Sequence, residues 1–317
     1  MIQVSHLTKW YGDHLAVDDL SFEIPQGAVY GFLGPNGAGK STTLNILTGC
    51  LSPTAGQVLI DGADILEEPE KAKRCLGYLP EQPPLYFHET PQEYLEFVGE
   101  AKGVRGKALQ VQLDAVMERT GIDQVCHQII GSLSKGYRQR VGIAQALLGE
   151  PKAIILDEPT VGLDPIQILE IRDLIRELGK THTVIFSSHI LSEVQAICEK
   201  VLIIAHGKLV ALDTPENLEK LLKGGNGVTF RADCGMEEAE CLLKDIPGIA
   251  AWKGSCQEGL LCLEVTTEEN ADMRKLCGEV SMVFASAGKP VLEMKQKKAN
   301  LEDVFLELAG GEKEEEA

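Results

Sequence analysis

A glycine-rich stretch near the start of the chain constrains its fold more than any other feature of the sequence. Residues 34–42 have the sequence GPNGAGKST and match the phosphate-loop pattern G-x-x-x-x-G-K-[ST]. The apolar run 28–33 before them is expected to be a buried strand, and 42–47 is expected to begin a helix. In this setting, glycines let backbone N–H groups surround a phosphate, and the helix N-terminus adds favourable partial charge. The pattern therefore predicts a nucleoside triphosphate site in which Lys40 pairs with the β- and γ-phosphates and the Ser41 hydroxyl binds Mg²⁺. The residues of this predicted loop are Gly34, Pro35, Asn36, Gly37, Ala38, Gly39, Lys40, Ser41 and Thr42.

Composition and charge narrow the classes of protein to which the chain can belong. Its 317 residues suffice for about two domains, and 44% hydrophobic with 25% charged residues is typical of a soluble globular protein. No uncharged apolar run approaches the roughly 18 residues of a membrane helix, and the first residues lack the layout of a secretion signal. The net charge of −18, without a sustained basic cluster, argues against nucleic acid as the main ligand. We therefore expect a cytoplasmic protein in which any membrane role comes through a partner.

The first residues have the alternation and the turn residues of short antiparallel strands, at 2–7, 15–17 and 20–24. They predict an N-terminal antiparallel β subdomain ahead of the phosphate loop. Tyr11 lies in this part of the chain, and an aromatic ring held beside a nucleotide can stack on adenine. A partly buried aromatic at the end of a strand accounts for the same position equally well.

A second apolar strand is expected at 76–79, and it ends at the sequence PEQPP, where prolines stop both helix and strand. Gln82 is thus a loop residue at the C-terminal end of a strand, which is where ligands of open α/β sheets bind. It could orient a water molecule or contact Mg²⁺. From about residue 84 to 150 helical periodicity replaces the strand pattern, which predicts a helical insertion into the α/β domain.

Ser134 precedes the apolar stripe of the last helix in this insertion and is a natural N-cap residue. The hydroxyl and the free N–H groups of an exposed first turn make an anion-binding end. The local pattern alone nevertheless favours an ordinary capped helix.

Two carboxylates follow the next buried strand, 153–156, and they favour a functional role for Ser134 over an ordinary helix cap. Buried carboxylates are costly unless they are paired or bound to a cation, so beside a phosphate loop they favour a catalytic site over two solvated acids. Asp157 is placed to hold Mg²⁺, directly or through water, and Glu158 is placed to act on the attacking water. His189 follows the strand 183–186 and can donate to a γ-phosphate, although a lone histidine there is more often a surface residue.

The last third of the chain has a different pattern. Residues 223–227 have the composition of a linker, and 228–310 follow the order strand, helix, strand, strand, helix, strand, with a further helix at 301–308. This order predicts a small ferredoxin-like α+β domain without an evident catalytic cluster, suited to packing, dimer contact or regulation. The acidic residues 311–317 are expected to form a solvated tail.

Taken together, the motifs resemble those of the ATP-binding subunits of ABC transporters. The signature LSKGYRQR, the stretch EQPPLY and the segment NLEDVF at 300–305 are similar to the export-type subset, which includes drug, antibiotic and gliding-motility ATPases with separate permease chains. The resemblance implies an α/β fold in which an ABC-type P-loop NTPase core, with the N-terminal β subdomain and the helical insertion, precedes the α+β domain. It covers about residues 1–222, and the matching elements in order are Tyr11, Gly34–Thr42, Gln82, Leu133–Tyr137, Asp157–Glu158, Gly162–Asp164 and His189.

The resemblance also implies a role for each matching residue, with ATP and Mg²⁺ as the bound groups. Ser134 and Gly136 would reach the γ-phosphate of an ATP held mainly by a second subunit, identical or related, and Asp164 would lie at that dimer seam. Lys135 and Tyr137 depart from the usual glycine and glutamine of the signature, which leaves the contacts to the sugar open. The roles implied for the remaining residues are adenine stacking by Tyr11, phosphate binding by Lys40 and Gly37–Thr42, Mg²⁺ binding by Ser41, Gln82 and Asp157, action on the lytic water by Glu158, and contact with the γ-phosphate by His189.

The expected function is therefore ATP hydrolysis that powers a membrane permease, with the subunit on the cytoplasmic face of the membrane. A ribosome-acting ABC protein would usually carry two nucleotide domains in one chain, and a DNA-repair relative would carry a long coiled coil between Lys40 and Ser134. A phosphate-loop kinase or GTPase would not account for Ser134, Glu158 and His189 together. A soluble ABC-type ATPase or a regulatory nucleotide-binding subunit remains the alternative.

Overall fold

A computed structural model describes residues 1–221, 227–244, 246–257, 260–267 and 272–297 of the chain. It divides into two compact units, the first of which runs from Met1 to Pro215 and the second from Glu216 to Glu307. The chain is thus divided at the start of α8 (Pro215–Leu221), whereas the sequence predicted a domain limit after this helix, at residue 222. The expected linker residues 223–226, the helix at 301–308 and the acidic tail lie outside the described residues, and the domain limits stay a prediction.

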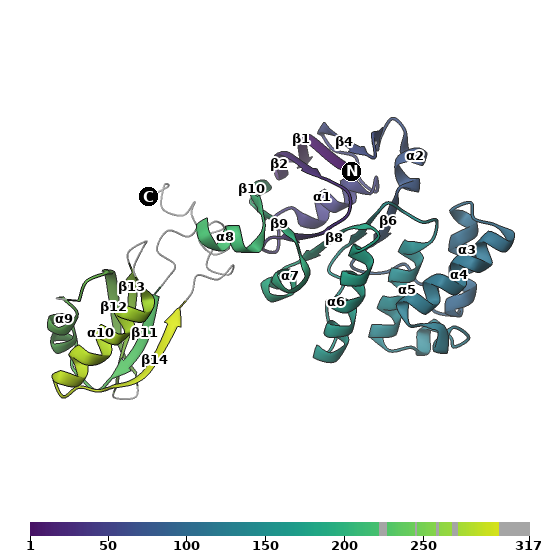
Figure 1. Cartoon of the computed structure of the whole chain (residues 1–317). Helices are drawn as coiled ribbons and strands as arrows, with labels where there is room; N and C mark the ends of the chain where they lie inside the picture. Colours follow the sequence, from purple (N-terminus) through teal and green to yellow (C-terminus); the bar gives the residue numbers. More distant parts are fainter. Residues whose placement is uncertain (222–226, 245, 258–259, 268–271, 298–317) are drawn as a thin grey trace. The chain divides into compact units, whose positions relative to one another are not determined.

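The centre of the first unit is a six-stranded sheet in the order β10-β9-β3-β8-β7-β6 (Figure 1). Its inner strands are parallel and apolar, because helices cover a parallel sheet on both faces and every side chain is then buried. Only β10 runs antiparallel to its neighbour β9. The strands are β3 (Val29–Leu33), β6 (Leu76–Leu79), β7 (Ala153–Leu156), β8 (Thr183–Ser188), β9 (Lys200–Ala205) and β10 (Lys208–Asp213).

The expected N-terminal β subdomain is a second, antiparallel sheet in the order β2-β1-β4-β5. Helix α1 (Lys40–Leu47) shares one hydrophobic core with both sheets: Leu44 and Leu47 are fully buried in the same cluster as Val4 and Ile155. The phosphate loop is thus held by the core of the whole unit. The strands of this sheet are β1 (Ile2–Tyr11), β2 (His14–Ile24), β4 (Ala55–Ile60) and β5 (Ala63–Asp64).

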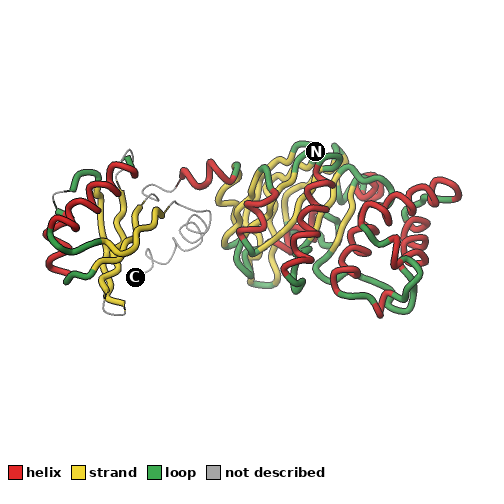
Figure 2. The backbone as a smooth tube through the Cα atoms, turned by 60° about the horizontal axis from the view of Figure 1, so that its bottom comes forward, coloured by secondary structure: helices red, strands yellow, loops and turns green. Residues whose placement is uncertain are grey.

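The expected helical insertion contains three α-helices. Thr90 and Glu93 form a capping box at the start of α3, and Gly121 in the left-handed region ends α4. Two further helices, α6 and α7, follow β7 and β8. Figure 2 shows the helices (red) of this unit alongside its strands (yellow). In the described residues no helix combines the length and apolar character needed to cross a membrane. The α-helices of this unit after α1 are α2 (Pro69–Arg74), α3 (Pro91–Ala101), α4 (Gly106–Thr120), α5 (Lys135–Leu147), α6 (Pro165–Gly179) and α7 (Leu191–Ile197).

The second unit confirms the expected ferredoxin-like fold. Its antiparallel sheet has the order β12-β13-β11-β14, which is the order that the sequence of strands and helices predicts. Alternate residues of the strands, among them Phe230 and Leu263, join Phe284 of the second helix in a separate core. The elements are β11 (Gly227–Ala232), α9 (Met236–Leu243), β12 (Ile249–Gln257), β13 (Leu260–Thr267), α10 (Met273–Ser286) and β14 (Val291–Lys297).

Candidate active site

The phosphate loop joins the C-terminal end of β3 to the start of α1, as its sequence predicts. Gly39 has φ of 100°, and a Cβ atom there would lie 2.5 Å from the carbonyl oxygen of Ala16, so only glycine fits. Lys40 is the first residue of α1 and is 6% exposed. Its Nζ donates to the carbonyl oxygen of Gly34 at 2.8 Å and to that of Pro35 at 3.3 Å. The backbone carbonyl groups at the start of the loop therefore bind the side chain of the lysine near its end.

Lys40 faces the carboxylates that follow β7, two strands away from β3 in the sheet. Its Nζ lies 3.9 Å from Oε1 of Glu158. Burial lowers the pKa of the lysine, and the negative charges of Glu158, Asp157 and Glu81 oppose that shift. The ammonium group and the carboxylates thus compensate each other's charge at the end of the sheet.

Asp157 and Glu158 follow β7 and are 3% and 8% exposed. Ser187, fully buried at the end of β8, links the two residues: its Oγ donates to Oδ1 of Asp157 at 2.6 Å and accepts the backbone N–H of Glu158 at 2.8 Å. Glu158 has φ of 47°, in the left-handed region that residues with a Cβ rarely adopt. Such a conformation persists where the surroundings fix it, and the bond to Ser187 is one of those restraints.

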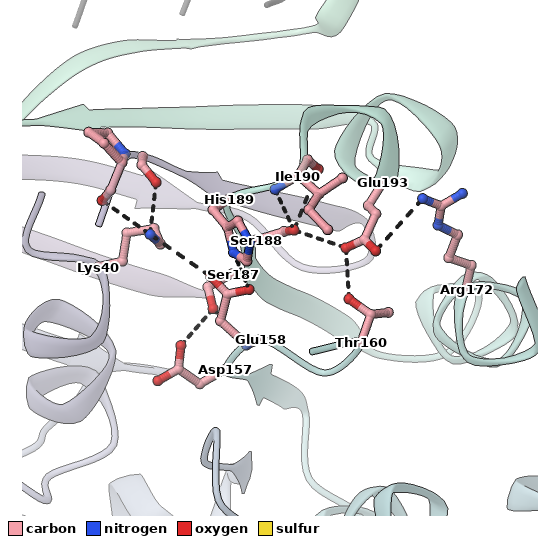
Figure 3. Close-up of polar contacts among 12 residues, drawn as sticks. Lys40, Asp157, Glu158, Thr160, Arg172, Ser187, Ser188, His189, Ile190 and Glu193 are labelled. Atoms are coloured by element: carbon pink, nitrogen blue, oxygen red, sulfur yellow. Dashed lines mark hydrogen bonds and ion pairs between the residues drawn. The ribbon is translucent and has the colours of Figure 1, made fainter. Parts of the chain in front are cut away.

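His189, the residue after β8, contacts the same glutamate. Its Nδ1 lies 2.9 Å from Oε2 of Glu158, which places this carboxylate between Lys40 and His189 (Figure 3). An ionised carboxylate only accepts hydrogen bonds, so Nδ1–H donates to it and Nε2 remains for another partner. The imidazole is 43% exposed, and a ligand can therefore reach it.

Lys40, Glu158 and His189 line a pocket of about 390 Å³, whereas Asp157 and Ser187 do not line it. Tyr11, whose side chain is 47% exposed, lies at this pocket, with the Nζ of Lys9 5.3 Å from the centre of its ring. Gln82 is an exposed loop residue that does not line the pocket, whereas its neighbour Glu81 does. The lining residues are Tyr11, His14, Ala16, Asn36, Gly37, Gly39, Lys40, Ser41, Thr42, Glu81, Glu158, Val161 and His189.

The signature residues lie elsewhere on the unit. Ser134 is exposed and caps α5, where its Oγ accepts the N–H of Tyr137 at 3.3 Å. Gly136 lies against Gln167, whose Cδ would be 2.7 Å from an added Cβ. Asp164 caps α6 by accepting the N–H groups of Ile166 and Gln167. Since none of the three predicted ligands on these turns lines the pocket, the chain by itself does not bring the two halves of the expected site together.

Two residues at this edge of the sheet match no recognisable sequence motif: Ser187 and a buried acid on α7, Glu193. Oε2 of Glu193 accepts from Oγ1 of Thr160 at 2.8 Å and from Oγ of Ser188 at 2.9 Å. The available signal was a pair of hydroxyls, Ser187-Ser188, at the end of a strand next to the strand that carries the acids. The partners of Ser187 lie about 30 residues away along the chain, and the partner of Ser188, Glu193, lies on a short helix that the sequence pattern does not predict.

Comparison with known proteins agrees with this geometry. Residues 17–161 match the ABC transporter family. The chain is 35% identical to the bacitracin transport ATP-binding protein BcrA of Bacillus licheniformis over 98% of both chains.

Two solved structures have the same fold as the first unit. The ATP-binding cassette MJ0796, solved as a dimer in a post-hydrolysis state with ADP and Pi, has a TM-score of 0.61 and 26% identity, covering 68% of this chain and 98% of its own. The protein cbiO1 of Clostridium perfringens, part of the ABC transporter complex cbiONQ, has a TM-score of 0.62 and 30% identity, covering 68% and 89%. With the phosphate loop, Glu158 and His189 at one pocket, these similarities show that the chain belongs to the ABC transporter family as an ATP-binding subunit that hydrolyses ATP.

Proposed function

We propose that this subunit powers an export-type ABC transporter whose permease is a separate membrane protein. The similarity to a bacitracin transport protein extends over nearly the whole chain, including the second unit, and this favours export of a drug or antibiotic. The subunit would then act on the cytoplasmic face of the membrane, held there by the permease.

In this proposal each group at the pocket has one task in ATP hydrolysis. Lys40 and the N–H groups of the phosphate loop bind the phosphates, and Tyr11 stacks on adenine. Glu158 orients and polarises the attacking water. Its carboxylate is held in position for this role, since Oε1 faces Lys40 and Oε2 faces His189. His189 donates through its second ring nitrogen, Nε2, to the γ-phosphate, which requires the doubly protonated imidazolium because Nδ1–H already donates to Glu158.

Ser41, Asp157 and Gln82 are the proposed ligands of Mg²⁺, which would neutralise charge on the phosphates. All three supply oxygen atoms, the ligands that this ion prefers, and Mg²⁺ usually keeps several waters, so a dedicated cage is not required. The bond from Ser187 to Oδ1 of Asp157 orients the carboxylate and leaves Oδ2 free for a ligand, which supports the assignment.

We propose that a second copy or a related subunit completes the site. Ser134 is exposed at the start of α5, outside the pocket, and Gly136 is buried in the same first turn. A helix N-terminus attracts the phosphates of a nucleotide held by another chain. Asp164 belongs to the turn between the acids and α6, and in a head-to-tail dimer it would lie at the seam. ATP binding would then also be an assembly step.

The proposed permease contact is the helical insertion. Three large aromatic side chains are about half exposed there, Tyr86, Phe87 and Phe97, with the rings of Tyr86 and Phe97 5.5 Å apart. Exposed aromatic clusters of this kind are typical of contact surfaces between proteins. Closure and opening of the dimer would move this surface and so drive the permease.

The observation that carries the proposal is the position of Glu158 between Lys40 and His189. Glu158→Gln keeps the size of the side chain and removes its charge, so ATP should still bind and stabilise a dimer while turnover stops. Size-exclusion chromatography with ATP and a phosphate-release assay measure both outcomes. Glu177→Gln, at an exposed acid paired with Lys180, is the matched control with normal turnover. Normal hydrolysis by Glu158→Gln would refute the role of the glutamate.

A second experiment separates a transporter motor from a soluble or regulatory ATPase. The membrane protein that co-purifies in mild detergent is reconstituted with the subunit in lipid vesicles. Stimulated ATP turnover supports a motor, and a set of exclusively soluble partners counts against transport.

A further inference from the structure

The loop after β7 and the end of β8 are cross-linked at three points. The first is Ser187, which bonds both Asp157 and Glu158, and the second is the contact of His189 with Glu158. The third passes through Glu193, which belongs to neither segment. It lies on α7, is 1% exposed, and does not line the nucleotide pocket.

Glu193 holds the two segments with one oxygen atom. Its Oε2 accepts from Thr160, two residues after Glu158, at 2.8 Å, and from Ser188, the residue before His189, at 2.9 Å (Figure 3). Both hydroxyls are buried. The acid therefore fixes the spacing between the segment that carries the proposed base and the segment that carries the proposed phosphate ligand.

Burying the carboxylate of Glu193 carries a free-energy cost that is unnecessary for a residue with no role beyond packing α7. A buried carboxylate loses its hydration, and apolar side chains of similar volume usually pack a helix at lower cost. Here Nη2 of Arg172, on α6, lies 3.8 Å from Oε1 and supplies the opposite charge, while both hydroxyl donors are directed to Oε2. This division leaves one carboxylate oxygen for cross-linking the two segments.

We propose that Glu193 is a positioning residue for ATP hydrolysis. It sets the distance between Glu158 and His189 through Thr160 and Ser188 and does not touch the nucleotide. The inference rests on the proposed roles of Glu158 and His189. A displacement of reacting groups by about 1 Å costs on the order of 100-fold in rate, so a lost cross-link should lower turnover more than nucleotide binding.

The test compares variants that differ in the acceptor oxygen. Glu193→Gln keeps an oxygen for the two hydroxyls, whereas Glu193→Leu keeps volume and removes both acceptors. We expect Glu193→Leu to lower kcat by about 10–100-fold with ATP affinity within about twofold of wild type, and Glu193→Gln to restore most of kcat. Thr160→Val removes one hydroxyl with little change in shape and should lower kcat in the same direction. If Glu193→Leu does not fold, the kcat of Thr160→Val tests the positioning role by itself.

The control is Thr90→Val, since Oγ1 of Thr90 also donates to a glutamate, Glu93, at 2.8 Å, but on the helical insertion. Its turnover should equal that of wild type. Unchanged kcat in Thr160→Val, or an equal loss in the Leu and Gln variants of Glu193, would overturn the inference. Glu158→Gln is assayed in parallel: if it is inactive while Glu193→Leu is fully active, only the positioning role fails, whereas an active Glu158→Gln refutes the proposed site itself.

Discussion

Ser187 offers the sharpest test of how the acids are held. Its hydroxyl is fully buried, donates to Oδ1 of Asp157 at 2.6 Å and accepts the N–H of Glu158 at 2.8 Å. Ser187→Ala removes both bonds and leaves a buried carboxylate oxygen and a buried N–H without this partner. A hydrogen bond to a charged group contributes about 1.5–3 kcal/mol, and a buried N–H left unpaired costs about 1–3 kcal/mol, so we expect the free energy of unfolding to fall by about 3 kcal/mol.

Turnover should fall as well, because Asp157 is the proposed Mg²⁺ ligand. Loss of a hydrogen bond that orients a metal ligand typically costs about 10–100-fold in metal affinity or activity. The loss should be partly restored by raising the Mg²⁺ concentration if weaker ion binding is its cause.

The assay uses urea unfolding followed by tryptophan fluorescence, together with phosphate release. The chain has two tryptophans, Trp10 in the first unit and Trp252 in the second, so a Trp252→Phe background reports the first unit alone. Ser132→Ala is the matched control: that hydroxyl donates to the carbonyl oxygen of Ile129 at 2.7 Å at an exposed position, and we expect a change of about 0.5 kcal/mol or less. If Ser187→Ala unfolds within about 1 kcal/mol of wild type and hydrolyses ATP normally, Ser187 does not hold the acids.

Two further predictions concern the phosphate loop and the helical insertion. Gly39→Ala should lose nucleotide binding, measured with a fluorescent ATP analogue, because the new Cβ would lie 2.5 Å from the carbonyl oxygen of Ala16 at φ of 100°. Retained affinity would show that the loop can move away from β2. Nζ of Lys102 donates to the carbonyl oxygens of Gln145 and Leu148 near the end of α5, and loss of hydration lowers its pKa from 10.5 to about 8. The unfolded chain then binds more protons than the folded one between these pH values, so the free energy of unfolding should rise with pH across that window. Urea titrations of Lys102→Met should lack this rise, and an identical slope in both proteins would contradict the shift.

The sequence predicted best what depends on local pattern. Strands β6 and β7 have the bounds expected for them, because a strand buried on both faces of a parallel sheet is an uninterrupted apolar run. The start of β2 was less well predicted: 15–17 and 20–24 were expected as separate strands, but the structure has one strand, His14–Ile24, with Asp19 at φ of 51°. A residue in that conformation makes an irregularity that polar sequence alone cannot distinguish from a turn.

Helix α7 was not expected at all. It has seven residues, and a helix of that length is stabilised by its contacts more than by its own sequence. Its buried acid, Glu193, interrupts the apolar stripe that would reveal the helix. The individual candidates Lys40, Glu158 and His189 were identified because each follows a strand. Ser187 was not, because its bonds reach a distant part of the chain, and Glu193 was not, because it lies on a helix that was not expected.

The geometry of the site follows from strand register as much as from the motifs. Leu156 of β7 pairs with Phe186 of β8, so the next residues, Asp157 and Ser187, are opposite each other, as their hydrogen bond requires. Shifting β8 by one residue would bring Ser188 opposite Asp157, and the hydroxyl of Ser188 already bonds Glu193. Both strands are completely buried, so a shift would also move every side chain to the other face of the sheet. The packing of the sheet therefore fixes which residues at the ends of β7 and β8 face each other, and core substitutions in either strand that keep the fold but alter register should affect hydrolysis without touching a ligand residue.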